Sequence, residues 1–220
     1  MHDSVRRFLR FLMTGNTAEL LTISVASIVA MPAPLLPVHI LWVNLVTDGL
    51  PGLLLANEPA EPDSMARPPR PARESLFAHG MLRHIAVFGT AMATFSLLGF
   101  FAARHDGDAA GRTLAFTTLV CCQLAHALVV RSEQRSLFGK GWRGNTPLLL
   151  VVLGSFALQL LVVYTPIGNR LLHTQPLDPS AFGLVFAAAF AVVLGVEAEK
   201  ARARRNTERA AKEISSTTSR

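Results

Sequence analysis

The chain has 220 residues, of which half are hydrophobic and only 16% are charged, and its mean hydropathy is +0.37. This composition excludes an ordinary water-soluble domain and is typical of a polytopic membrane protein. The net charge of +6 comes from Lys and Arg residues that flank the apolar stretches on one side, so binding to nucleic acid is not needed to explain it.

Six apolar stretches are long enough to cross a hydrocarbon core about 30 Å thick, which takes about 20 helical residues. They lie at about residues 12–31, 38–57, 81–103, 113–130, 146–165 and 180–197. The sequence therefore predicts an all-α membrane bundle of six transmembrane helices in one domain, residues 1–200. A basic tail follows at residues 201–220, helical at first and partly disordered at its end.

The first predicted span contains two polar side chains, Asn16 and Glu19. Their spacing of i and i+3 places both on one face of a helix. A carboxylate near the centre of a membrane helix costs roughly 2.5–3.5 kcal/mol on insertion scales. We therefore expect Glu19 to face the interior of the bundle and to share a partner there.

The second span contains a larger polar group, formed by Asn44, Thr47 and Asp48. These residues stand at i, i+3 and i+4, so their three oxygen-bearing side chains share a helix face. Directly behind them, Gly49 and Pro51 weaken the helix and leave backbone carbonyls unpaired. We expect the helix to be broken at Asp48-Gly49-Leu50-Pro51, where the freed carbonyls add further oxygen ligands.

The short turn from Met31 to Pro37 makes the first two spans antiparallel neighbours. Glu19 lies about a dozen residues before this turn and Asp48 lies about eleven after it, so the two carboxylates are expected at similar depth. No Lys or Arg stands at matching depth, and a bound cation would neutralise both. A ligand set made only of oxygen suits a hard ion such as Ca²⁺, Mg²⁺, Na⁺ or K⁺ better than zinc or copper.

Interhelical hydrogen bonding is the alternative explanation for polar residues in membrane helices, at about 0.6 kcal/mol each. We favour that explanation for four residues of the later spans: Thr117, Thr118, Ser155 and Gln159. Two carboxylates at one depth are hard to explain in this way.

The positive charges predict the orientation of the six spans. Of the 21 Lys and Arg residues, 18 fall on the side that holds both termini, and only Arg104, Arg112 and Arg170 fall on the other. By the positive-inside rule, both termini are expected in the cytoplasm. The expected location is the plasma (inner) membrane, with the basic tail near anionic headgroups of the lipid bilayer.

The segment from about Val5 to Phe77 resembles the fifth and sixth membrane helices of P-type cation-transporting ATPases, most closely the calcium-pump branch. Three runs of sequence carry the resemblance: NTAE from Asn16 to Glu19, PVHILWVNLVTDGLP from Pro37 to Pro51, and DSMARPPR from Asp63 to Arg70. Residues from Met81 to Glu197 are similar to the last four helices of that family in hydropathy and spacing, with a weak local match around Gln123.

The resemblance implies roles for individual residues. The residues implied to coordinate the transported cation are Asn16, Glu19, Asn44, Thr47 and Asp48, with Asp48 bridging two family sites. Gln123 stands where the calcium-pump pattern has an acidic residue. Its amide still offers an oxygen but brings no charge, which weakens attraction for a second divalent ion. A loop with Arg67, Pro68, Pro69 and Arg70 resembles the segment that abuts the phosphorylation domain; alternatively, it is a basic loop obeying the positive-inside rule.

Three signatures of P-type pumps do not occur in these residues: Asp-Lys-Thr-Gly, Thr-Gly-Glu and Gly-Asp-Gly-x-Asn-Asp. We therefore expect no ATP site and no ATP hydrolysis by this chain alone. It is expected to be a truncated or split pump chain, whose N-terminal domains lie in cis or on a separate chain. A secondary cation transporter and a non-catalytic membrane partner or regulator of a pump remain as alternatives.

Overall fold

A computed structural model describes residues 2–56, 80–132 and 146–218, and all regular structure in these ranges is helical. The elements in chain order are α1 (His2–Ile28), α2 (Pro37–Trp42), η1 (Val43–Gly49), α3 (Leu50–Ala56), α4 (Met81–Ala103), η3 (Arg104–Asp106), α5 (Asp108–Val130), α6 (Thr146–Tyr164), α7 (Pro166–Leu172) and α8 (Ala181–Thr218). The predicted all-α fold is confirmed.

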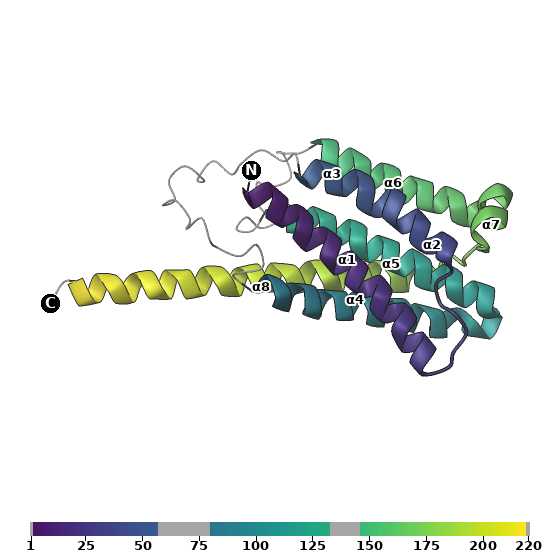
Figure 1. The fold of residues 1–220 in the computed structure, drawn as a ribbon, viewed down its shortest axis with the longest axis horizontal. Coiled ribbons are helices and arrows are strands. Elements are labelled where there is room, and N and C mark those ends of the chain that lie inside the picture. Colours follow the sequence, from purple (N-terminus) through teal and green to yellow (C-terminus); the bar gives the residue numbers. More distant parts are fainter. Residues whose placement is uncertain (1, 57–79, 133–145, 219–220) are drawn as a thin grey trace.

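Six helical stretches of the described residues are long and apolar enough to cross a membrane. They are Ser4–Ile28, Pro37–Ala56, Met81–Asp106, Asp108–Val130, Thr146–Tyr164 and Ala181–Asn206. Successive stretches run in opposite directions, and both termini lie at the same end of the bundle (Figure 1). The predicted membrane bundle of six spans is therefore confirmed, while the side on which the termini lie stays a prediction.

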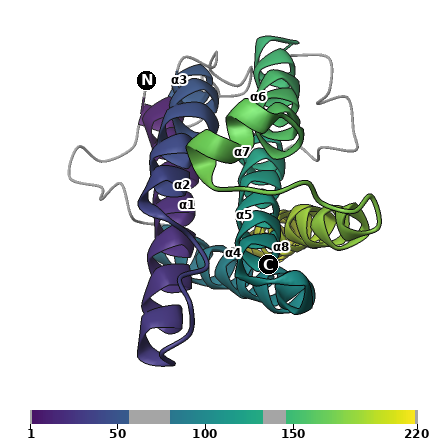
Figure 2. The same ribbon diagram turned by 90° about the vertical axis from the view of Figure 1, so that its right-hand side faces the viewer.

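Helix α5 is the central helix of the bundle. In its most apolar window 89% of the residues are buried, whereas no other span exceeds 44%. It packs against α1, α4, α6 and α8, and the end-on view shows these helices around it (Figure 2). Phe116 and Leu119 of α5 join Phe11 of α1 in the largest apolar cluster, and all three are fully buried. Polar side chains on α5 thus lie where several helices meet.

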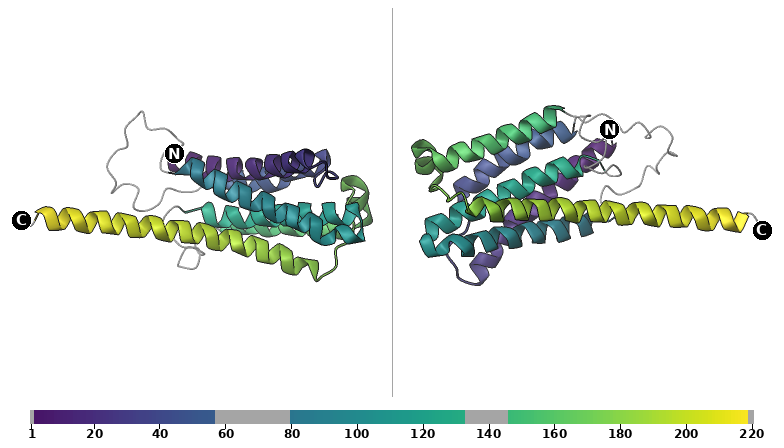
Figure 3. Two further views of the ribbon diagram at one scale, coloured as in Figure 1. Left: turned by 90° about the horizontal axis from the view of Figure 1, so that it is seen from below. Right: turned by 180° about the vertical axis from the view of Figure 1, so that it is seen from behind.

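Helix α8 is much longer than the predicted sixth span. It continues to Thr218, whereas the sequence predicts disorder from Ile214 onwards. Beyond the bundle it extends alone (Figure 3). Arg202, Arg204 and Arg205 are exposed on this part of the helix, so its charge is available to solvent or to headgroups.

A buried histidine joins the start of α2 to the end of α7. Nδ1 of His39 accepts a hydrogen bond from the backbone N–H of Leu36 at 3.2 Å, and Nε2 donates to the carbonyl of Leu172 at 2.7 Å. The ring stacks on Phe116 with 4.5 Å between centroids. Pro37 begins α2, where its missing N–H is tolerated. These contacts fix where the second span enters the bundle.

Close helix packing at Gly89 gives a test of the fold. A Cβ built on Gly89 of α4 would lie 2.8 Å from Cγ2 of Thr17 on α1, a β-branched residue that cannot move aside. We expect Gly89→Ala to destabilise the chain by roughly 1–3 kcal/mol through overpacking. The measurement is the thermal unfolding midpoint in detergent.

Gly183→Ala is the matched control, because nothing lies within 4 Å of its built Cβ. It should leave the midpoint unchanged or raise it slightly, since Ala favours helix over Gly. Equal midpoints for the two variants would contradict this packing of α1 against α4.

Candidate functional site

The second span is not broken at Asp48-Gly49-Leu50-Pro51 as predicted; it departs from α-helical geometry just before, in a π-helix that ends at Gly49, and Leu50 and Pro51 already lie in α3. Segment η1 carries Asn44, Thr47 and Asp48, and the helical path then continues into α3. A π-helix pairs residues i and i+5 and is wider than an α-helix, and such segments occur frequently at functional sites. The backbone is therefore widened here without losing its helical path.

One carbonyl of this segment, that of Val46, receives no hydrogen bond from Pro51 and receives one from Ser155. Pro51 lies in the first turn of α3 and has no N–H, so it gives nothing to the Val46 carbonyl five residues before it. The hydroxyl of Ser155 on α6 donates to that carbonyl at 3.2 Å. Helix α6 thus satisfies one carbonyl of the π-helix by a side-chain hydrogen bond.

This hydrogen bond gives a direct prediction. Ser155→Ala leaves the buried Val46 carbonyl without the donor, and we expect it to destabilise the chain by about 1 kcal/mol. Ser155→Thr keeps a hydroxyl and should cost less. Thermal unfolding of both variants in the same detergent checks the difference, and an unfolding midpoint for Ser155→Ala at or above that of Ser155→Thr would show that the hydroxyl does not support η1.

Two carboxylates and one amide meet where α1, η1 and α5 converge. Nε2 of Gln123 on α5 donates to Oε1 of Glu19 on α1 at 3.0 Å, and both side chains are buried. Asp48 is 2% exposed, and its carboxylate is close enough to that of Glu19 for the two charges to interact. The expected proximity of the two acidic groups is therefore present in the structure.

Gly15 allows this approach. A Cβ built on it would lie 3.0 Å from Nε2 of Gln123 and 3.4 and 3.6 Å from the two carboxylate oxygens of Asp48. These distances leave no room for a larger residue without displacing the polar groups. Gly15 was not among the predicted site residues, although its position one residue before Asn16, on the helix of Glu19, was an available signal.

Several buried oxygens of this cluster have no hydrogen-bond partner within the part of the chain that the structure describes. They are both carboxylate oxygens of Asp48, the hydroxyl oxygen of Thr47 and Oε1 of Gln123. Buried polar atoms are normally paired, because an unpaired one costs about 1–3 kcal/mol and a charged one more. Oxygens alone, two of them on a carboxylate, are the ligands that a hard cation requires.

Asn16 and Asn44 lie differently from the other predicted ligands. Both are exposed on the surface of the chain, and Nδ2 of Asn44 donates to the carbonyl of Ile40 in its own helix at 2.9 Å. Asn44 lines a pocket of about 260 Å³ together with Asp48, Gly49 and Phe8. The buried cluster therefore has an opening on the face that carries Asn44.

The other predicted residues divide into those with contacts and those outside the described ranges. Gln159 accepts from Nε1 of Trp42 at 3.1 Å and donates to Thr117 at 3.2 Å, which confirms both Gln159 and Thr117 as interhelical hydrogen-bonding residues. The prediction is wrong for Thr118, whose buried hydroxyl has no hydrogen-bond partner among the described residues. The predicted coupling loop of Arg67, Pro68, Pro69 and Arg70 lies outside the described residues.

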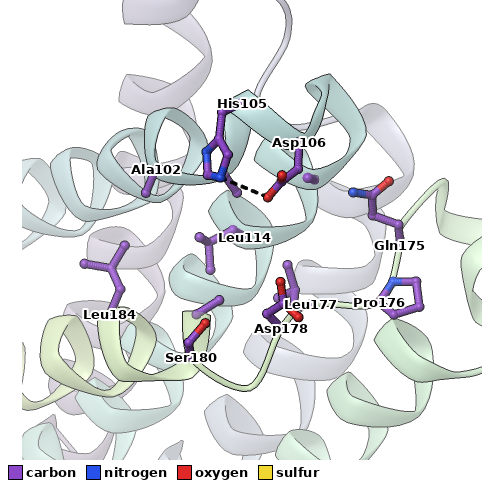
Figure 4. A pocket seen from close by; sticks show the side chains of 13 residues that line it. Ala102, His105, Asp106, Leu114, Gln175, Pro176, Leu177, Asp178, Ser180 and Leu184 are labelled. Carbon is purple, nitrogen blue, oxygen red and sulfur yellow. Dashed lines mark ion pairs between the residues drawn. The ribbon is translucent and has the colours of Figure 1, made fainter.

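A second pocket, of about 410 Å³, lies at the opposite end of the bundle from the two termini. Nε2 of His105 and the carboxylate of Asp106 form an ion pair at 3.2 Å, and Asp178 lies across the pocket from them (Figure 4). All three side chains are exposed, and none of the predicted ligands lines this pocket. Asp178 and His105 therefore offer control positions away from the predicted ligands.

The candidate ligand atoms of this cluster are oxygens of Glu19, Thr47, Asp48 and Gln123. Within the described ranges, no group of three or more His, Cys, Asp or Glu residues is arranged to hold a metal ion. Two carboxylates supplemented by amide, hydroxyl and backbone oxygens suit Ca²⁺ or another hard cation better than zinc or copper.

Comparison with known proteins gives a consistent picture. Residues 32–202 match the family described as "Cation transporting ATPase, C-terminus". Over 188 residues the chain is 37% identical to the calcium-transporting ATPase of Bacillus subtilis (strain 168), which covers 84% of this chain and 21% of that protein. Over 222 residues it is 31% identical to the calcium-transporting ATPase type 2C member 1 of Homo sapiens, which covers 100% of this chain and 24% of that protein. The chain thus spans less than a quarter of the length of these relatives.

Proposed function

Because the chain belongs to the cation-transporting ATPase family, matching its C-terminal part, we propose that it binds and translocates Ca²⁺ as the membrane portion of a P-type pump. The observation that carries this proposal is the buried Asp48 carboxylate, which has no hydrogen-bond partner among the described residues and lies beside the Glu19–Gln123 pair. Two negative charges at membrane depth are unfavourable without a counter-charge. A divalent cation supplies that charge and occupies the unpaired oxygens together.

In this mechanism Asp48 and Glu19 provide the charge, and the neutral groups complete the coordination. Gln123 holds Glu19 by a hydrogen bond from Nε2, and its Oε1 faces no donor, so it offers a ligand oxygen without a change in position. Thr47 offers a hydroxyl oxygen from the same π-helix as Asp48. Ca²⁺ takes six to eight oxygens, so the side chains named here need backbone carbonyls or water to complete the shell.

Asn16 and Asn44 mark the face of the bundle that other parts of the pump would cover. An amide exposed at membrane depth meets no water in hydrocarbon, so polar side chains there normally face protein or a cavity. We infer that membrane helices from the N-terminal part of the pump cover the face that holds Asn16 and Asn44. These two residues would then join the cation site, and the pocket beside Asp48 would lie on the path to it.

The domains that would supply energy from ATP belong on one side of the membrane. We propose that phosphorylation and nucleotide-binding domains lie on the side of the two termini, which the positive-inside rule places in the cytoplasm. The loop of Arg67, Pro68, Pro69 and Arg70 would contact the phosphorylation domain on that side. We propose that the membrane is the plasma (inner) membrane.

The test uses a chimaera in which this chain replaces the matching segment of the Bacillus subtilis calcium-transporting ATPase. We expect the chimaera to form a phosphoenzyme from ATP only when Ca²⁺ is present and to take up ⁴⁵Ca²⁺ into vesicles. A chimaera that inserts normally but shows neither activity, while the parent pump shows both, would contradict the proposal. The variant with Asp48→Asn serves as the matched low-affinity control, which should need a much higher Ca²⁺ concentration for both activities.

A further inference from the structure

Two buried histidines and a glutamate form a hydrogen-bonded chain that the cation site does not use. Nε2 of His84 on α4 lies 2.9 Å from Nε2 of His126 on α5. Nδ1 of His84 lies 2.5 Å from the carboxylate of Glu199 on α8. The two histidines are 2% and 1% exposed, whereas the Glu199 side chain is 41% exposed. The chain therefore runs from solvent into the core across three helices.

The contacts fix how many protons the pair can hold. One assignment of protons satisfies both contacts: Nδ1–H of His84 donates to the carboxylate of Glu199, and Nε2–H of His126 donates to Nε2 of His84. With these two protons both rings are neutral. A third proton, on Nδ1 of His126, leaves both hydrogen bonds in place and shares one positive charge between the rings. The same geometry thus fits a neutral and a protonated pair.

Charged groups from every neighbouring helix surround this pair. Arg10 of α1 and Lys200 of α8 act on both histidines and oppose a further positive charge there, whereas Arg10 and Arg83 of α4 act on Glu199 and favour its charged form. Glu197 pairs with Lys200 at 3.1 Å, and Nζ of Lys200 also donates to the carbonyl of Val129 at 2.7 Å. Arg204 adds a further positive charge near Lys200. Glu199 is therefore the anion that directly contacts the histidine pair.

The pair is also close to the proposed cation site. His126 lies three residues after Gln123 on α5, about 4.5 Å along the helix and on the same side of it. Both residues are buried, at 1% exposure each. A positive charge on the histidine pair would act on a cation at Gln123 through the low-dielectric interior, where repulsion between like charges is strong.

We propose that His84, His126 and Glu199 form a proton-binding site that takes up one proton from solvent at the Glu199 end and thereby weakens cation binding beside Gln123. The weakening of cation binding rests on the proposed function, whereas uptake of the proton does not. The site would make cation affinity fall as the solution at that end of the bundle becomes acidic.

The first measurement follows proton uptake directly. The chain, labelled with ¹⁵N-histidine and held in nanodiscs of phosphatidylcholine and phosphatidylglycerol, is titrated from pH 8.5 to pH 5, with His84→Asn and His126→Asn used to assign signals. We expect the pair to gain one proton, with a midpoint that Glu199→Gln lowers by about one pH unit. Rings that do not change protonation over this range, or a midpoint unchanged in Glu199→Gln, would overturn the proton site.

The second measurement follows the coupling in the chimaera. The half-saturating Ca²⁺ concentration is compared at pH 6 and pH 8, and we expect His126→Asn and Glu199→Gln each to reduce their ratio several-fold. His105→Asn, which removes an exposed histidine paired with Asp106, should leave the ratio unchanged. A ratio unaffected by all three changes would overturn the coupling. A chimaera that binds no Ca²⁺ at either pH would overturn the cation site and the coupling with it, while the titration of the chain still decides the proton site.

Discussion

Replacing Asp48 by Asn is expected to raise the half-saturating Ca²⁺ concentration of the chimaera by about 100-fold, which corresponds to roughly 2.7 kcal/mol. The substitution keeps the shape of the side chain and one oxygen but removes one of the two carboxylate charges of the cluster. Affinity for Ca²⁺ depends strongly on the number of charged ligands. Insertion into the membrane should not suffer, because neutralising a buried carboxylate makes insertion easier.

The measurement is Ca²⁺-dependent phosphorylation by ATP against Ca²⁺ concentration at matched expression. Glu19→Gln should have an effect near that of Asp48→Asn, whereas Gln123→Ala removes a neutral ligand and should have a smaller one. Asp178→Asn makes the same chemical change in the exposed pocket at the other end and should leave the curve unchanged. An Asp48→Asn curve that coincides with the curve of the unmodified chimaera would remove Asp48 from the site.

The second large effect is expected for Gly15→Ala. Its Cβ would lie 3.0 Å from Nε2 of Gln123, which must give way by a few tenths of an ångström, and would touch Oδ1 of Asp48 at 3.4 Å. We expect the half-saturating Ca²⁺ concentration to rise by about tenfold, or roughly 1.4 kcal/mol. The change adds no charge and removes no ligand, so it tests the position of the cluster and not its composition.

Gly154→Ala provides the matched control for this change. Gly154 lies in α6, and nothing lies within 4 Å of its built Cβ. The two variants should therefore differ in Ca²⁺ affinity although they introduce the same methyl group. Identical Ca²⁺ curves for the two variants would show that α1 does not approach Asp48 and Gln123 as closely as the structure has it.

Hydropathy and charge predicted much of this fold, because the membrane requires long apolar helices. The six spans follow from stretch length, and the closeness of Glu19 to Asp48 follows from a short turn between antiparallel helices. The form of the distortion in the second span could not be predicted from the sequence. Gly49 and Pro51 indicate a weak helix, but the π-helix also receives a hydrogen bond from the hydroxyl of Ser155 on α6, which is distant in sequence.

Other parts of the site depend on how helices cross. Asn16 and Glu19 share a helix face by spacing, yet Glu19 is buried against α5 and Asn16 is exposed, because the edge of the packed surface passes between them. The approach at Gly15 and the contact of His84 with His126 each join residues of different helices. Residue spacing along one chain carries no direct signal for such pairs.

The most direct test of the central claim is a cryo-EM map of the chimaera with Ca²⁺, compared with a map of the same protein with a chelator. We predict difference density at about 2.3–2.6 Å from carboxylate oxygens of both Asp48 and Glu19, the usual Ca²⁺–oxygen distance. Density for Ca²⁺ within the membrane that contacts neither carboxylate would contradict the account.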